Sequence, residues 1–232
     1  MSNNIFRIVL PALFAFVITG CSVKDMDLGK ILKPEEKKFE YKRELISEDL
    51  TIRVDEIVKA MKNNDIELIN KKYIHPTFGF YNLYKIKSIN VFTFQNQIYN
   101  VKENKTEEVS HLISRVSKNK YIFKINKEDT EFRCSPLNDA YYGWTKYGLF
   151  LNDKTNTNLS SMMKKINAFE KEKYKKEDFH KVKMIEKMGY KVVLTPEIIF
   201  YLNKIDNNWY ITLIDRITTD CSYKKETKKK VK

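Results

Sequence analysis

The residues of this sequence best suited to metal or acid–base chemistry are three histidines, and they lie far apart. They are His75, His111 and His180, and none belongs to a His-Glu-x-x-His or Cys-x-x-Cys pattern that would bring metal ligands together. The chain also lacks the Gly-x-Ser-x-Gly turn that exposes a catalytic serine, and its 6 glycines form no phosphate-cradling loop. The sequence therefore predicts no metal, no cofactor and no nucleotide chemistry.

The first 21 residues have the organisation of an export signal. Arg7 lies in a short polar lead, and an apolar run from Ile8 to Ile18 follows, which is shorter than the roughly 20 apolar residues of a transmembrane helix. Ile18-Thr19-Gly20-Cys21 resembles the lipobox of bacterial lipoproteins. That resemblance implies cleavage between Gly20 and Cys21 and a lipid on the Cys21 sulfur. An uncleaved anchor or a buried N-terminal helix is the alternative.

The lipobox resemblance also implies a location. One acyl chain holds a protein only marginally, whereas two or three chains anchor it stably, so the membrane is the first predicted partner. The residue after Cys21 is Ser22 and not an aspartate. In a Gram-negative cell this resembles the class sorted to the outer membrane, facing the periplasm. We therefore expect a lipid-anchored protein of the cell envelope.

Two cysteines remain once Cys21 carries lipid. Cys134 and Cys221 are an even pair in an exported protein, so a disulfide between them is the simplest expectation. The bond would close a loop of nearly ninety residues, which the chain-entropy model values at roughly 4.5 kcal/mol. Two buried free thiols, packed as small apolar residues, are the alternative.

Length and charge indicate one globular domain with a solvated basic surface. The chain has 232 residues, 42% of them hydrophobic, which is enough to bury a sizeable core. Its net charge of +13 comes almost wholly from lysine, whereas nucleic-acid sites favour arginine, so a nucleic-acid partner is not expected. We predict a signal peptide over 1–20, a tether over 21–45, one α+β domain over 46–223 and a basic disordered tail over 224–232.

Apolar residues recur at helical spacing in four segments. The first helix is capped by Ser47, and a capping box of Asn64 and Glu67 opens a second one that ends before His75-Pro76. The third runs through Val109 and Val116. The fourth is an additional charged helix over 158–188, which packs its apolar stripe into the core or, alternatively, binds a partner.

The clearest β pattern lies at the end of the domain. Residues 197–205 and 209–218 read as a hairpin around Asp206-Asn207-Asn208, and strict alternation places Asp215 on the same face as Trp209. Further strands are expected over 89–94 and 121–125, whereas 77–81 is expected to be an aromatic turn.

These elements resemble, in their order, the secreted bacterial members of the nuclear transport factor 2-like superfamily. The resemblance spans roughly residues 50–217 and rests on the two short helices, the segment Tyr73-Ile74-His75-Pro76-Thr77-Phe78-Gly79-Phe80, the Trp144 turn and the closing strand Asn208–Asp215. It implies a nuclear transport factor 2-like or cystatin-like α+β fold, with a curved antiparallel sheet packed on N-terminal helices.

The superfamily includes isomerases and cyclases that hold an acid or base in the concavity of the sheet. The resemblance therefore implies a small-pocket enzyme as one hypothesis, with Asp215 helped by His75, Tyr81 or Tyr210 as candidates. The favoured hypothesis is a noncatalytic envelope module that binds an envelope protein, a glycan or a small apolar ligand. An open concavity with a desolvated acid would favour the enzyme, and a filled one the binding module.

Overall fold

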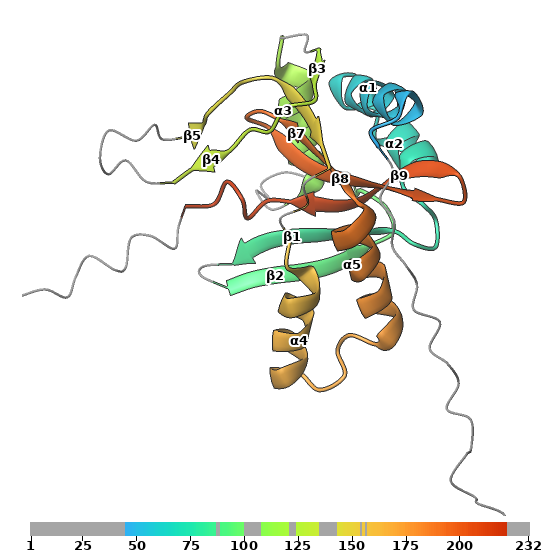
Figure 1. Cartoon of the computed structure of the whole chain (residues 1–232), viewed down its shortest axis with the longest axis vertical. Helices are drawn as coiled ribbons and strands as arrows, with labels where there is room; N and C mark the ends of the chain where they lie inside the picture. The colour runs from blue at the N-terminus through green and yellow to red at the C-terminus, as the bar shows by residue number, and fades with distance from the viewer. Residues whose placement is uncertain are drawn as a thin grey trace, which may run out of the picture. The chain divides into compact units, whose positions relative to one another are not determined.

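The computed structural model describes residues 45–86, 89–99, 108–120, 124–134, 143–153, 155 and 157–221. All of them belong to the second of two units, Glu40–Lys232. The predicted lipobox, the predicted tether up to residue 44 and the predicted tail over 224–232 lie outside the described residues. Figure 1 shows the elements, which in chain order are α1 (Glu48–Lys62), α2 (Ile66–Tyr73), β1 (Phe80–Ile86), β2 (Ile89–Gln95), α3 (Val109–Lys118), β3 (Ile125–Asn126), β4 (Phe132–Arg133), β5 (Gly143–Trp144), β6 (Leu149–Asn152), α4 (Leu159–Phe169), α5 (Lys176–Met188), β7 (Tyr190–Leu194), β8 (Ile198–Ile205) and β9 (Asn208–Asp215).

The first two helices begin at side-chain caps. Ser47 caps α1 as predicted, because its hydroxyl accepts a hydrogen bond from the amide of Leu50. The predicted cap of α2 was wrong by one residue. Asp65, not Asn64, accepts from the amide of Leu68, and Asn64 instead makes the turn with a φ of 53°. Asparagine tolerates this left-handed conformation better than most residues. Because asparagine and aspartate are both common N-caps, the sequence pattern fits either residue.

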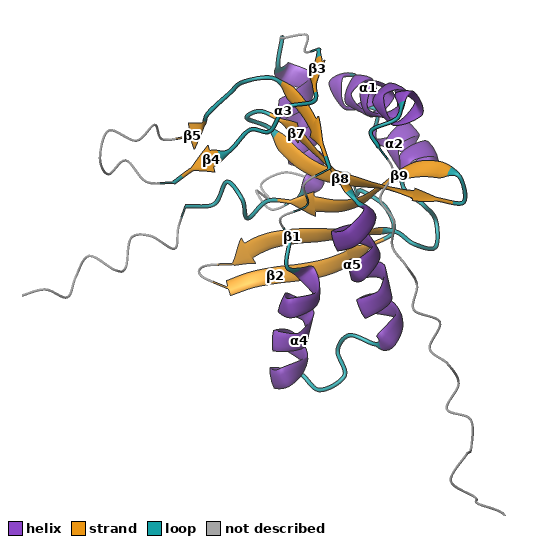
Figure 2. Ribbon diagram, viewed as in Figure 1, coloured by secondary structure: helices purple, strands orange, loops and turns teal. Residues whose placement is uncertain are grey.

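The main sheet has seven strands in the order β2-β1-β9-β8-β7-β6-β3 (Figure 2). Its pairings are antiparallel except for β1 with β9 and β3 with β6. The terminal hairpin turns at Asp206 and Asn207, both with positive φ, as a tight two-residue turn requires. Strand β1 begins inside the segment expected to be an aromatic turn, and β7 lies where no strand was expected. The fold is thus α+β, with a mostly antiparallel sheet packed against helices.

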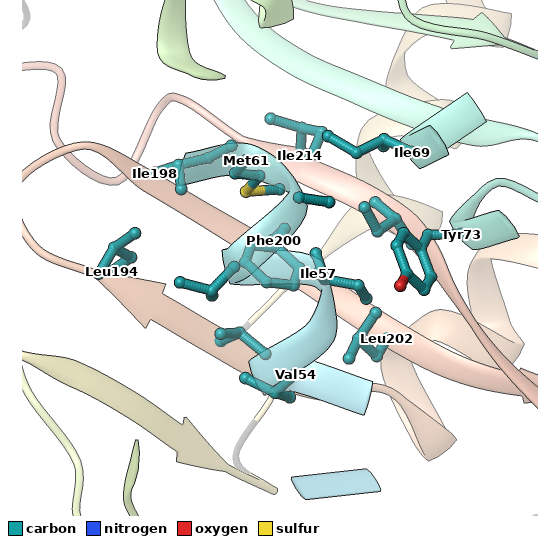
Figure 3. Packing of buried hydrophobic residues seen from close by; sticks show 14 of the residues in the cluster. Val54, Ile57, Met61, Ile69, Tyr73, Leu194, Ile198, Phe200, Leu202 and Ile214 are labelled. Carbon is teal, nitrogen blue, oxygen red and sulfur yellow. The ribbon is translucent and has the colours of Figure 1, made fainter. Parts of the chain in front are cut away.

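Helices cover both faces of this sheet (Figure 1). On one face, α1, α2 and α3 pack on the strands through a continuous apolar cluster, part of which Figure 3 shows. Ile57 and Met61 of α1 lie there against Phe200 of β8 and Ile214 of β9. On the other face, α4 and α5 pack on a second cluster that includes Tyr81, Val193 and Leu213. Burial of both faces fixes the register of every central strand.

The charged segment over 158–188 was expected to be one helix, and this was wrong: it forms two helices, α4 and α5. The chain reverses at Glu172, which has a φ of 58°. Asn167 holds the reversal, because its amide donates to the carbonyl of Tyr174 and its oxygen accepts from the Tyr174 amide, at 2.8 and 2.9 Å. Paired polar contacts of this kind replace the helical hydrogen bonds that the reversal removes.

A bulge in β9 corrects the predicted placement of Asp215. Tyr201 pairs with Leu213 but Leu202 pairs with Ile211, so Thr212 is an extra residue in the ladder. Alternation is therefore interrupted, and Asp215 pairs with Ile199 on the face covered by α4 and α5. Trp209 stays on the opposite face with α1.

Candidate functional site

The four side chains named as catalytic candidates occupy three separate places. His75 and Tyr210 are neighbours, with ring centroids 5.0 Å apart in an edge-on arrangement. His75 Nδ1 accepts from the amides of Thr77 and Phe78, and its Nε2 lies 3.4 Å from the carboxylate of Asp206. Its ring thus holds the turn after α2 and joins it to the terminal hairpin, which is a structural role.

Tyr81 is fully buried between the sheet and α5. Its ring stacks on Phe92 at 4.5 Å, and its hydroxyl donates to Asp178 Oδ1 at 3.2 Å. Burial, with the nearby Asp178 carboxylate, raises the pKa of the Tyr81 hydroxyl. This phenol is therefore a fixed donor to α5 rather than an exchangeable acid.

Asp215 ends β9 and caps the turn that follows. Its Oδ1 accepts from the amides of Ile217 and Thr218 at 3.0 and 3.1 Å, and its Oδ2 accepts from the Thr218 hydroxyl at 2.6 Å. Tyr210 and Asp215 lie about 17 Å apart along the strand, given a rise of about 3.3 Å per residue. The structure therefore does not bring the four candidates together, and side chains fill both sheet faces.

A cavity of about 410 Å³ instead opens at the end of the sheet, where β8 begins, β9 ends and α3 passes over them. We call it the α3 cavity. Its apolar lining consists of Leu112, Trp144, Pro196, Ile198 and Ile199. A second hollow of about 960 Å³ adjoins it and adds the exposed ring of Tyr147. The two spaces share Arg115, Lys118, Pro196 and Glu197. Volumes of this size are typical of sites for small molecules.

Cationic side chains border the α3 cavity. Arg115 and Lys118 reach it from α3, Arg216 from the end of β9, and Lys120 borders the adjoining hollow. Arg115 Nη2 donates to the backbone carbonyl of Glu197 at 3.1 Å, which fixes the guanidinium at the rim. The guanidinium has five N–H donors, so this bond leaves others for a ligand.

Two acidic residues, Glu197 and Asp215, line the α3 cavity. Glu197 has the more unusual environment. Its Oε1 accepts from the Asn119 amide at 3.3 Å, while its Oε2 is buried. Burial raises the pKa of this carboxyl, against the opposing effects of the Asn119 hydrogen bond and the charges of Arg115 and Lys62. Glu197 is thus a partly buried acid at the end of the sheet.

Three lining residues carry a buried polar atom that has no hydrogen-bond partner in the described part of the chain. They are Trp144 Nε1, His111 Nε2 and Glu197 Oε2. Trp144 is 3% exposed, so its indole N–H has little access to solvent. Buried polar groups are nearly always paired, and each exception asks for an explanation. Three further unpartnered atoms among the described residues, on Asn82, Ser110 and Thr157, do not belong to the lining of this cavity.

A disulfide closes the wall that carries Trp144. Cys134 is bonded to Cys221, with Cα atoms 5.2 Å apart, which joins the end of β4 to the segment after β9. Phe132 pairs with Trp144 across the β4–β5 ladder, and their rings meet edge-on at 5.3 Å. The covalent link therefore holds the Trp144 ladder beside Thr219, which lines the cavity from the C-terminal segment.

Sequence reasoning named Asp215, Trp144 and His111, which line this cavity, but it missed Glu197 and the cationic residues, although one signal for those of α3 exists. His111, Arg115 and Lys118 fall at i, i+4 and i+7, so they share one face of α3, opposite its apolar stripe. That face has the pattern of an ordinary solvated surface. Nothing in the local sequence shows that Glu197 and Arg216 come to face it.

Among the described residues, no helix combines the length and apolar character needed to cross a membrane. The same residues hold no cluster of three or more metal-ligating side chains. Comparison with protein-family models, with curated proteins and with solved structures gave no match to this chain. Its function is therefore inferred from its own residues.

Proposed function

We propose that this protein is a lipid-anchored lipoprotein of the bacterial cell envelope whose folded domain binds a small ligand in the α3 cavity. The lipobox resemblance at Ile18–Cys21 supports the anchor, and Ser22 supports an outer-membrane location facing the periplasm in a Gram-negative cell. Of the expected partners, the cavity favours a small, partly apolar ligand over an envelope protein or a glycan.

The proposed relation to the nuclear transport factor 2-like superfamily gains support from the element order. Two helices precede the β1–β2 hairpin, α3 follows it, and the chain closes with the β8–β9 hairpin. The α4–α5 pair is an addition between β6 and β7 that covers the second face. In this interpretation the ligand site has moved from the covered sheet face to the sheet end.

The observation that carries the binding proposal is the gathering of unpartnered buried polar atoms around a cavity. Leaving a buried polar group unpaired costs about 1–3 kcal/mol, so three such groups around one cavity are expensive unless a ligand pairs them. Because these atoms are closed off from solvent, a ligand recovers part of that cost only by shifting the side chains that cover them.

Native mass spectrometry tests this proposal on the full lipoprotein, extracted in mild detergent and incubated with an envelope extract. A bound small molecule should add a discrete mass to the wild type. Ser114→Trp places a large ring in the α3 cavity and should abolish that mass. Ser161→Trp makes the same change at an exposed position of α4 and should leave it intact.

A small-pocket enzyme stays the second candidate, because the α3 cavity holds a desolvated acid. A raised carboxyl pKa moves Glu197 toward the range in which an acid exchanges protons with a substrate, and His111 lines the same cavity. Glu197→Gln separates the two candidates in a deletion strain. A protein that retains the ligand mass but loses the cellular role would favour the enzyme.

A further inference from the structure

The α3 cavity and its adjoining hollow have a composition that selects for one kind of ligand. Four cationic side chains border the two spaces, on a rim that is exposed at Arg115, Lys118 and Lys120. Two carboxyls, Glu197 and Asp215, stand among them. Since the Asp215 carboxylate already accepts three hydrogen bonds, it offers little to a cationic ligand. The surplus of positive charge therefore favours an anion.

The apolar lining limits which anion fits. Leu112, Pro196 and the two isoleucines of β8 form a wall against which a small, fully hydrated ion would gain nothing. Tyr147 adds an exposed aromatic ring at the adjoining hollow. A ligand with one anionic oxygen group and an apolar body would use both parts of the site.

We propose, resting on the proposed function above, that the α3 cavity binds an apolar monocarboxylate. Its carboxylate lies between Arg115 and Lys118 on the exposed rim, and its body lies on the apolar wall. Inorganic phosphate is disfavoured, because it has no apolar body to pack on the wall and loses more hydration when it is buried. Arg115 suits this role, since a guanidinium binds a carboxylate through two parallel hydrogen bonds.

Benzoate is the simplest probe of this chemistry, and two relatives isolate its parts. Benzamide keeps the ring and shape but removes the charge, and inorganic phosphate keeps an anion but removes the ring. By isothermal titration calorimetry on the full chain, benzoate should bind at least about tenfold more tightly than either, since a charge-assisted hydrogen bond is worth about 1.5–3 kcal/mol. If benzamide binds as tightly as benzoate, the site does not recognise a carboxylate. If phosphate binds as tightly as benzoate, the site does not recognise an apolar body.

Variants of the rim test which residues hold the carboxylate. Arg115→Gln and Lys118→Gln should each weaken benzoate binding about tenfold, and both positions are exposed, so folding should survive. Lys183→Gln makes the same charge change at an exposed position of α5 that does not line the α3 cavity, and it should have no effect. Unchanged binding in both rim variants would overturn the assignment.

The mass-spectrometric test keeps the two proposals apart. If Ser114→Trp abolishes the envelope-derived mass while benzoate binds no better than benzamide, the ligand class is wrong and the binding module stands. If the mass persists in Ser114→Trp, the α3 cavity is not the site and the proposed function itself is wrong.

Discussion

The hydroxyl of Thr212 donates a 2.6 Å hydrogen bond to Oδ1 of Asn203 across the bulge between β8 and β9. Both side chains are buried, and Asn203 also donates to the carbonyl of Met184 in α5 at 3.1 Å. The pair thus connects the extra residue of the bulge to the helix that covers this face. The bulge in turn places Asp215 at the sheet end, where it borders the α3 cavity.

Thr212→Val should therefore lower the free energy of unfolding by about 1–3 kcal/mol, because it leaves a buried amide oxygen of Asn203 without its partner. Denaturant unfolding measures the change. Thr212→Ser keeps the hydroxyl and should recover most of the loss. Equal destabilisation by valine and serine would contradict the role of the hydrogen bond.

The same bulge shows where prediction from sequence succeeds and where it stops. The terminal hairpin and the cap at Ser47 follow from local turn and helix chemistry, and both are confirmed. Alternation along β9 is equally local, yet it placed Asp215 on the wrong face, because a bulge depends on a partner strand that the local pattern does not reveal.

The α3 cavity was not predictable for the same reason. Its walls come from α3, β5, the β7–β8 connection and the end of β9, which lie up to about a hundred residues apart in the chain. Each of these segments has an ordinary sequence by itself. Only the sheet order brings Trp144, Glu197 and Arg115 to one place.

The stability of the folded protein should depend on the ionisation of Glu197. Burial raises the pKa of this carboxyl in the folded protein above its ordinary value of 4.5. The folded state therefore binds the proton more tightly than the unfolded state does. The stabilisation of the folded state by protonated Glu197 is therefore complete at pH values below about 4.5. It is lost as the pH rises through the pKa that Glu197 has in the folded protein.

Glu197→Gln should remove this dependence, so its melting temperature should fall less than that of the wild type between pH 4.5 and neutral pH. Thermal unfolding across that range measures the difference. Glu67→Gln, at an exposed position of α2, serves as the matched control. A wild-type pH profile in the Glu197 variant would show that burial of this carboxyl has no thermodynamic effect.

The disulfide should support the proposed ligand site as well as the fold. The double variant Cys134→Ser, Cys221→Ser frees the segment that carries Thr219 from the β4–β5 strand pair that carries Trp144. Ligand binding should therefore weaken even at temperatures where the variant is fully folded. Calorimetry with benzoate, at a temperature where the variant is folded, measures this. In the wild type, thiol labelling after denaturation without reduction should find neither cysteine reactive.

The proposed lipid anchor would depend on the sulfur of Cys21. Cys21→Ala should leave a precursor that keeps its signal peptide and no longer incorporates labelled palmitate, because the proposed lipid is attached to that sulfur. Gel mobility and palmitate labelling in cells measure both effects. Cys134→Ser should keep its label, and continued labelling of the Cys21 variant would refute the lipoprotein assignment.

The role of Asp215 distinguishes a turn cap from a general base. Asp215→Asn keeps an oxygen that can accept from the amides of Ile217 and Thr218, but it weakens the bond with the Thr218 hydroxyl, so about 0.5–1.5 kcal/mol of stability should be lost. A general base would lose about 10²–10⁴-fold in rate when its carboxylate is neutralised. Complementation of a deletion strain, alongside a melting curve, separates these outcomes, and we expect the cellular role to change no more than the stability does. A variant with wild-type melting but no cellular role would instead make Asp215 a catalytic residue and the domain an enzyme.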